Sequence, residues 1–448
     1  MIGILWGIGG MAGILLIAVL LSSNRRAIKV RTVVAALGLQ VVFGIAVLYW
    51  PFGQRVLGVV SDGVQEVIGS ANAGISFVFG GLVPEDGVVF ALQVLPVIIF
   101  FASLTAVLYH WGILQFVVNW LGRGIGWLLG TRRAESVNTA ANIFVGQTEA
   151  PLVIRPYIPG LTRSGLFAVM VGGLTTVAGS VLVGYSLLGA PLEYLIAASF
   201  MAAPGALLMA KILEPETVSD EEADKLEMAG AAKLAAQNSD APVVAPAAAG
   251  EDAEIPWAEG ETGEKPVVVE DPGDALKHRN VIDAAAAGAS DGLRLALTVG
   301  AMLLAFIALI ALVNLIIGTV GGWFGAPDLT FEQILGWVFA PIMTMIGVPW
   351  NEAVASGSFV GQKVVVNEFV AFADFGPQIE SFSPKTAAIT TFALTGFANL
   401  SSLGILLGGL GGLAPERRPE IAELGIRAIL AATRANLMSA TIAGMMLA

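Results

Sequence analysis

The stretch from Phe144 to Pro156, FVGQTEAPLVIRP, places three polar side chains in a row inside a strongly apolar chain: Gln147, Thr148 and Glu149. A glycine precedes them and a proline follows, and both residue types interrupt regular helices. The surrounding residues 137 to 160 form a short apolar half, a polar break and a second apolar half. This pattern predicts a re-entrant hairpin, and irregular backbone at membrane depth is typical of a ligand site.

A second polar break has the same design. Residues 353 to 380 are also too polar for a single membrane-crossing helix, and they contain the stretch SGSFVGQKVVVNEFVAF. The letters FVGQ thus occur at Phe144 to Gln147 and again at Phe359 to Gln362, followed in each case by a carboxylate, Glu149 or Glu368. Each hairpin precedes a span rich in Gly, Ser and Thr, so the sequence predicts an internal repeat.

The composition places the chain in a bilayer. Hydrophobic residues make up 56% of it and charged residues 13%, with a mean hydropathy of +0.79, whereas a soluble domain carries roughly 25% charged residues. A spanning helix needs about 20 mostly apolar residues, and eight stretches qualify: roughly 4 to 22, 33 to 50, 89 to 109, 165 to 189, 191 to 213, 294 to 320, 386 to 413 and 425 to 447. The predicted fold class is therefore an all-α polytopic membrane protein. The first stretch is basic-free and long enough to span, so it is interpreted as a helix and not as a signal peptide.

Loop charges orient these helices because Lys and Arg collect on the cytoplasmic side of a membrane. Connections rich in basic residues follow the first, third and seventh spans, whereas the opposite side has few: Arg55, Lys363 and Lys385. We therefore expect both termini outside the cytoplasm. In this orientation the first hairpin enters from the cytoplasm and the second from outside, which makes the repeat an inverted one.

The net charge of −12 is concentrated in one segment. Residues 214 to 275 contain 17 acidic and 3 basic residues, which is −14, so the remainder of the chain carries +2. The segment is rich in Ala, Glu, Asp, Pro and Val, with too little apolar content to build a core. We therefore expect residues 214 to 280 to be an acidic, disordered cytoplasmic linker.

Carboxylates at membrane depth are energetically unfavourable, so Glu149 and Glu368 need a role. One interpretation is that each caps a half-helix or pairs within the protein, and the other is that they bind a substrate. Four nearby side chains offer further hydrogen-bonding groups: Gln147, Thr148, Asn399 and Ser402. These groups favour a neutral solute that forms hydrogen bonds, and carboxylates with few cations argue against an anionic substrate.

Four separated motifs carry a resemblance to a known family: ALQVLPVIIFFASL at Ala91 to Leu104, GQTEAP at Gly146 to Pro151, NEFVAF at Asn367 to Phe372 and GFANLSS at Gly396 to Ser402. Nearly the whole chain outside the acidic segment resembles the concentrative nucleoside transporters, particularly the sodium-coupled bacterial members. The resemblance implies a homotrimer in the inner membrane whose subunits each have eight transmembrane helices and two re-entrant hairpins. It also implies sodium-driven symport of nucleosides of the uridine, cytidine and adenosine class into the cell, by alternating access.

The resemblance also divides the chain. Helices 1 to 3 of the scaffold are expected at 1–110, with an interfacial helix at about 52–80. The first repeat is expected at 111–213, with an interfacial helix, the first hairpin and helices 4 and 5. After the linker, scaffold helix 6 is expected at 281–325, and the second repeat at 326–448 contains an interfacial helix, the second hairpin and helices 7 and 8.

Matched position by position, the resemblance implies a nucleoside site between the two repeats. The nucleobase side is assigned to Gln147, Thr148 and Val181, with Glu149 acting through water or on the sugar side. The ribose side is assigned to Glu368, Asn399 and Ser402, with Phe397 beside them. A vicinal diol offers two donors to a carboxylate, which suits Glu368.

The coupling ion is implied to lie between the tip of the first hairpin and an unwound point of the fourth helix. The implied sodium ligands are the Asn142 side chain, the Val145 carbonyl, the Thr176 hydroxyl and the Val177 carbonyl. All four are oxygens, as a hard cation prefers. Two alternatives remain: Asn142 and Thr176 cap helix ends, or a proton couples transport through Glu149.

Other chemistries find little support in the sequence. The chain has no Cys, and its two His residues, His110 and His278, lie far apart along it, so no thiol chemistry, His-based metal site or catalytic triad is expected. We expect no cofactor besides the coupling ion. The expected partners are a nucleoside, sodium, the lipid bilayer and further copies of the chain, and not nucleic acid. An intramembrane enzyme that uses Glu149 and Glu368 as acid and base is the remote alternative.

Overall fold

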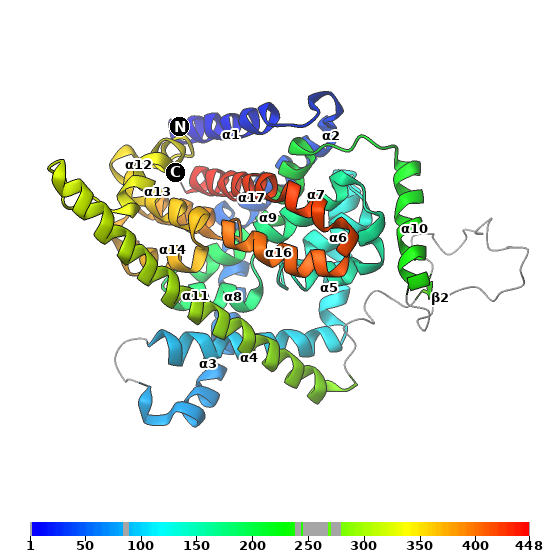
Figure 1. The fold of residues 1–448 in the computed structure, drawn as a ribbon, viewed down its shortest axis with the longest axis horizontal. Coiled ribbons are helices and arrows are strands. Elements are labelled where there is room, and N and C mark those ends of the chain that lie inside the picture. The colour runs from blue at the N-terminus through cyan, green and yellow to red at the C-terminus, as the bar shows by residue number, and fades with distance from the viewer. Residues whose placement is uncertain (1, 84–88, 238–242, 245–267, 270–278, 448) are drawn as a thin grey trace, which may run out of the picture.

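The computed structural model describes residues 2–83, 89–237, 243–244, 268–269 and 279–447 (Figure 1). The α-helices are α1 (Ile2–Leu20), α2 (Val30–Gly44), α3 (Pro51–Phe79), α4 (Phe90–His110), α5 (Ile113–Leu129), α6 (Arg133–Ala141), α7 (Arg163–Thr175), α8 (Gly179–Leu187), α9 (Leu192–Leu213), α10 (Asp220–Gln237), α11 (Val281–Trp323), α12 (Phe331–Met345), α13 (Trp350–Val365), α14 (Glu368–Phe375), α15 (Pro384–Leu394), α16 (Leu400–Leu413) and α17 (Arg418–Met446).

Shorter elements connect these helices. They are the π-helix η2 (Ile45–Tyr49) and the 3₁₀ helices η1 (Arg25–Ala27), η3 (Gly80–Leu82), η4 (Ala150–Gly160), η6 (Gly376–Ser381) and η7 (Pro415–Arg417). Two strands of two residues each, β1 (Val243–Val244) and β2 (Val268–Val269), pair antiparallel. The described chain is otherwise helical, which confirms the all-α class.

Helices α4 and α11 form a tightly packed pair, and Figure 1 shows α11 running diagonally across α4. Two glycines four residues apart make the close approach possible. A Cβ at Gly288 would lie 2.6 Å from Ala106 Cβ, and one at Gly292 would lie 2.7 Å from Ala102 Cβ. Small residues with this spacing allow helix backbones to pack closely without a hydrophobic driving force, as helices in a bilayer must.

The two halves of the chain repeat one order of elements. An amphipathic helix, α5 or α12, leads into a hairpin, which is α6 with η4 in the first half and α13 with α14 in the second. A broken helix follows, α7/α8 or α15/α16, and then a long buried helix, α9 or α17. The two predicted hairpins therefore lie where the polar breaks indicated, and both following spans are interrupted.

The two hairpins differ in their returning arms, and prolines account for this difference. The returning arm of the first one is the 3₁₀ helix η4, which has Pro156 and Pro159 in its interior. A proline removes a backbone N–H donor and clashes with the preceding turn, so an α-helix does not form there. The returning arm of the second hairpin lacks proline and is the α-helix α14, which Asn367 caps by accepting a hydrogen bond from the Val370 N–H (2.9 Å).

Six helical segments among the described residues are long and apolar enough to cross a membrane: Gly3–Leu20, Val30–Tyr49, α4, Arg163–Leu187, α9 and α11. A seventh results if α12 and α13, bent by 118°, count as one span. The last two predicted spans are not in this group. One is divided between α15 and α16, and α17 carries polar side chains such as Arg434 and Asn436. The count of eight spans stays a prediction.

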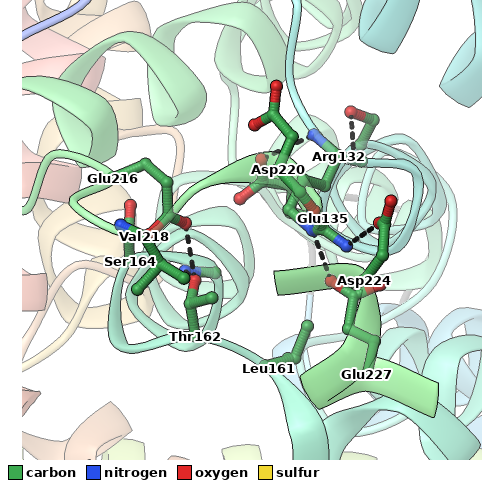
Figure 2. Close-up of polar contacts among 12 residues, drawn as sticks. Arg132, Glu135, Leu161, Thr162, Ser164, Glu216, Val218, Asp220, Asp224 and Glu227 are labelled. Atoms are coloured by element: carbon green, nitrogen blue, oxygen red, sulfur yellow. Dashed lines mark hydrogen bonds and ion pairs between the residues drawn. The ribbon is translucent and has the colours of Figure 1, made fainter. Parts of the chain in front are cut away.

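The prediction of a disordered linker is wrong for its first part, residues 220 to 237, which form α10 beside η4. Gly160 and Gly230 permit the contact, since a Cβ at Gly230 would lie 2.3 Å from the Gly160 nitrogen. Arg132 donates to Glu227 (2.6 Å) and Asp224 (2.5 Å), as Figure 2 shows. Charge pairing and close backbone contact thus replace the apolar content that the segment lacks. The rest of the predicted linker lies largely outside the described residues.

Arg132→Met is expected to release α10 from the first hairpin. The Arg132 and Glu227 side chains are only 14% and 13% exposed, and burial raises the pKa of the Glu227 carboxyl while the Arg132 guanidinium opposes that shift. Losing a charge-assisted bond at such a site costs about 1.5–3 kcal/mol, so amide hydrogen exchange in α10 should accelerate at least tenfold.

Lys225→Met is the matched control for this experiment. Lys225 forms an ion pair with Glu221 within α10, but both side chains are largely exposed, at 70% and 82%. Exposed pairs contribute little to stability, so exchange in α10 should remain close to that of the parent protein. Equal exchange in the parent and in Arg132→Met would show that the Arg132 contacts do not hold α10 in place.

Candidate functional site

A buried carboxylate lies where the second hairpin meets the second broken helix. Glu368 begins α14 at the hairpin tip and is 3% exposed. Its Oε2 accepts a hydrogen bond from Asn399 Nδ2 (2.6 Å), and its Oε1 accepts one from the Tyr185 hydroxyl (3.0 Å). Asn399 itself caps α16 by accepting from the Ser402 N–H (2.8 Å). The structure therefore brings together Glu368, Asn399 and Ser402, the three polar residues predicted for the ribose side.

Sequence reasoning missed Tyr185. Its ring is fully buried and stacks on Phe372, with centroids 4.4 Å apart, and meets the edge of Phe369 at 4.8 Å. The ring lies on α8 one helical turn after Val181, a predicted nucleobase contact that is 1% exposed. Residues four apart share a helix face, so this spacing was the available signal. Tyr185 joins the first repeat to the carboxylate of the second.

The tip of the first hairpin supplies three further predicted substrate residues, Gln147, Thr148 and Glu149. Gln147 is buried against α7, where a Cβ on Gly173 would lie 2.9 Å from its Cβ, and Gln147 Oε1 has no hydrogen-bond partner among the described residues. Thr148 faces α16, since a Cβ on Gly409 would lie 2.8 Å from Thr148 Cγ2. Hairpin 1 thus contacts both broken helices.

Two further predicted substrate residues, Glu149 and Phe397, are less buried than Glu368. Glu149 is exposed and turns back toward Gly146. Phe397 is partly buried within the break between α15 and α16. The two carboxylates that the sequence treated alike therefore occupy different environments, one exposed and one enclosed by donors.

The four predicted ion ligands lie on two segments that touch. Thr176 and Val177 occupy the break between α7 and α8, and the Gly179 N–H donates to the Phe144 carbonyl at the hairpin tip (3.1 Å). Asn142 ends α6 and Val145 follows in the same turn. Contact between hairpin and break places all four residues in one region of the fold.

Oxygen atoms in this region fit a hard cation. Asn142 Oδ1 is buried and has no hydrogen-bond partner among the described residues, while its Nδ2 donates to the Asn138 carbonyl (2.9 Å). The Thr176 hydroxyl donates to the Gly172 carbonyl (2.9 Å), which leaves its lone pairs available. A buried acceptor without a donor is unfavourable unless something fills the gap, and a sodium ion would do so.

Three family models match consecutive parts of the chain. "Na+ dependent nucleoside transporter N-terminus" matches residues 9–82, "Nucleoside recognition" matches 91–192, and "Na+ dependent nucleoside transporter C-terminus" matches 194–444, more than half of the chain. This protein belongs to the concentrative nucleoside transporter family. The resemblance inferred from four motifs is thereby confirmed.

Similar proteins match the transporter over its full length. An uncharacterised transporter, YutK, of Bacillus subtilis is 52% identical over 99% of both chains. The nucleoside permease NupC of Helicobacter pylori is 43% identical over 98% of this chain and 97% of its own. The structure of CNTnw in an inward-facing substrate-bound state matches with a TM-score of 0.85 and 49% identity, over 99% of this chain and 98% of that one.

The solved structures of CNTnw variants include outward-facing and intermediate states. Structures of one protein in several states are what alternating access requires, and they fit a transporter built on this fold. The family identity places this chain among membrane transporters.

Proposed function

We propose that this transporter is a sodium-coupled symporter that carries nucleosides of the uridine, cytidine and adenosine class into the cell. The observation that carries the proposal is the Glu368 carboxylate, buried at the hairpin tip and held by Asn399 and Tyr185. An ionised carboxylate with two oxygens accepts both hydroxyls of a vicinal diol. A ribose is such a group, and a free nucleobase is not.

The remaining substrate residues divide by chemistry. Asn399, Ser402 and Phe397 would complete the ribose side around Glu368, while Gln147, Thr148 and Val181 would contact the nucleobase, with Glu149 acting through water or on the sugar. Gln147 Oε1, a buried acceptor with no hydrogen-bond partner among the described residues, supports a polar ligand at this point. Purines and pyrimidines both present N–H donors that it would accept.

Sodium would bind to Asn142, the Val145 carbonyl, Thr176 and the Val177 carbonyl. The ion would supply positive charge to oxygens from both hairpin 1 and the α7/α8 break, so its binding would favour the arrangement in which Gln147 and Thr148 are in place. Such a link between ion and substrate is what symport needs, because coupling requires that each ligand favour the state the other prefers.

The proposal includes the assembly. Subunits with eight spans would form a homotrimer in the inner membrane, with both termini outside the cytoplasm. Exposed apolar side chains support large surfaces for lipid and for further subunits, including Phe77 on α3 and Trp127 on α5, which are 91% and 81% exposed.

Competition for uridine uptake tests the substrate assignment. In vesicles that contain the purified protein, unlabelled cytidine and adenosine should compete with radiolabelled uridine, and 2′,3′-dideoxyuridine should compete at least tenfold less well because it lacks the diol. Recovery of intact uridine from the vesicles would separate transport from catalysis. Equal competition by dideoxyuridine and uridine would contradict the role of Glu368 in binding ribose hydroxyls.

A further inference from the structure

A lysine that the sequence suggested was a loop charge is buried in the second hairpin. Lys363 lies on α13 and is 0% exposed. Its Nζ donates to the Ala393 carbonyl (2.8 Å) and to Asn436 Oδ1 (2.9 Å), and Glu368 supplies an opposite charge that acts on it. A buried ammonium is unfavourable unless such partners surround it, so its position is closely defined.

Asn436 continues the contact to the first repeat. This residue lies on α17, is 2% exposed and donates from Nδ2 to the Thr175 carbonyl (2.8 Å). Thr175 is the last residue of α7, directly before Thr176, and Ala393 lies next to the last residue of α15. The final carbonyls of a helix have no partners within it. Lys363 and Asn436 therefore satisfy the ends of both half-helices.

Gly396 shows how closely the two breaks approach. Its φ is +139°, and a Cβ there would lie 2.5 Å from the Thr175 oxygen and 2.6 Å from Asn436 Oδ1. The break between α15 and α16 thus meets the end of α7 at backbone contact, with Asn436 between them. A continuous hydrogen-bonded path runs from Thr175 through Asn436 and Lys363 to the second hairpin, whose tip holds Glu368.

We propose that Asn436 and Lys363 are positioning residues that couple the sodium region of the first repeat to the ribose region of the second. This inference rests on the proposed sodium symport. Sodium bound to Thr176 and Val177 would fix the Thr175 carbonyl beside them. Asn436 is hydrogen-bonded to both that carbonyl and Lys363. Sodium binding would therefore also fix the second hairpin, which carries Glu368. By reciprocity, nucleoside at Glu368 would tighten sodium binding.

Asn436→Asp tests this path with minimal change of shape. The substitution keeps an oxygen for Lys363 and removes the donor to the Thr175 carbonyl. The measurement is the dissociation constant of uridine for the purified protein in saturating sodium and in choline. We expect sodium to tighten uridine binding at least tenfold in the parent and less than threefold in Asn436→Asp. Lys363→Gln breaks the other end of the path, so sodium should tighten uridine binding less than threefold in this variant as well.

Thr441→Val is the matched control on the same helix. Its buried hydroxyl donates within α17, to the Leu437 carbonyl (2.7 Å), so sodium should tighten uridine binding in this variant by the same factor as in the parent. If Asn436 and Lys363 had only a structural role, their substitution would weaken uridine binding equally in sodium and in choline. In that case sodium would still tighten uridine binding at least tenfold in Asn436→Asp and Lys363→Gln, and this result would overturn the coupling role. Absence of any sodium effect in the parent is a different failure, since it would overturn sodium symport itself and the coupling path with it.

Discussion

Glu368→Gln is expected to lower nucleoside uptake at least a hundredfold while the protein remains folded. The carboxylate accepts two hydrogen bonds in this structure, from Tyr185 and Asn399, and would accept ribose hydroxyls when substrate binds. An amide replaces one acceptor oxygen with a donor and removes the charge. Bonds to a charged group contribute about 1.5–3 kcal/mol each, so impaired contact with two hydroxyls accounts for a loss of this size. Initial rates of radiolabelled uridine uptake into vesicles measure it.

Glu193→Gln provides the control for this substitution. Glu193, like Glu368, lies in the first turn of its helix, but it is exposed at the start of α9. The same chemical change there should leave uptake within twofold of the parent. Uptake by Glu368→Gln near the parental rate, with equal amounts of folded protein in the vesicles, would show that this carboxylate does not bind the substrate.

Thr176→Val is expected to raise the sodium concentration for half-maximal uptake at least tenfold, which corresponds to about 1.4 kcal/mol. Valine keeps the shape of threonine and removes the hydroxyl oxygen, which is one of the four proposed sodium ligands. At saturating sodium, uridine affinity should change much less, because Thr176 is not among the proposed substrate residues. Thr176→Ser retains the oxygen and should behave like the parent.

Thr175→Val separates ion binding from local helix stability. The Thr175 and Thr176 hydroxyls donate to carbonyls four residues earlier, at 2.7 and 2.9 Å, so the two substitutions remove equivalent bonds. Only Thr176 is a proposed sodium ligand. A rise in sodium requirement of the same size in both variants would mean that the helix end, and not a coordinating oxygen, accounts for the effect.

Much of the architecture could be predicted from the sequence, because local rules govern it. Gly146 and the polar residues that follow it lie between α6 and η4, as the local sequence predicts, and Asn367 marks the start of the returning arm of the second hairpin. Both hairpins could therefore be predicted. Asn367 and Asn399 precede apolar runs and cap α14 and α16 in the structure, as asparagine before a helix commonly does. The four family motifs added the order of the elements.

Contacts between distant segments could not be predicted in this way. Tyr185 and Glu368 are 183 residues apart, and Asn436 and Thr175 are 261 apart. Nothing local marks such partners. Lys363 was interpreted as a loop charge because composition alone treats every lysine in a polar stretch as solvated, whereas its acceptors come from α15 and α17.

The acidic segment shows a different limit. Its low apolar content predicted disorder, since hydrophobic burial is the usual source of folding free energy. Yet α10 packs on η4 through glycine contacts at Gly160 and Gly230, and the ion pairs of Arg132 join it to the start of α6. These features depend on a surface that the rest of the fold provides. A segment judged by its own composition gives no sign of that surface.

The measurement that tests sodium symport most directly is uridine accumulation in vesicles under an imposed sodium gradient. With sodium high outside and choline inside, uridine should accumulate above its external concentration, and a protonophore should leave this accumulation unchanged. Replacing external sodium with choline should abolish it. Accumulation that persists in choline and disappears with the protonophore would contradict the sodium assignment and transfer the coupling role to a proton, with Glu149 as its carrier.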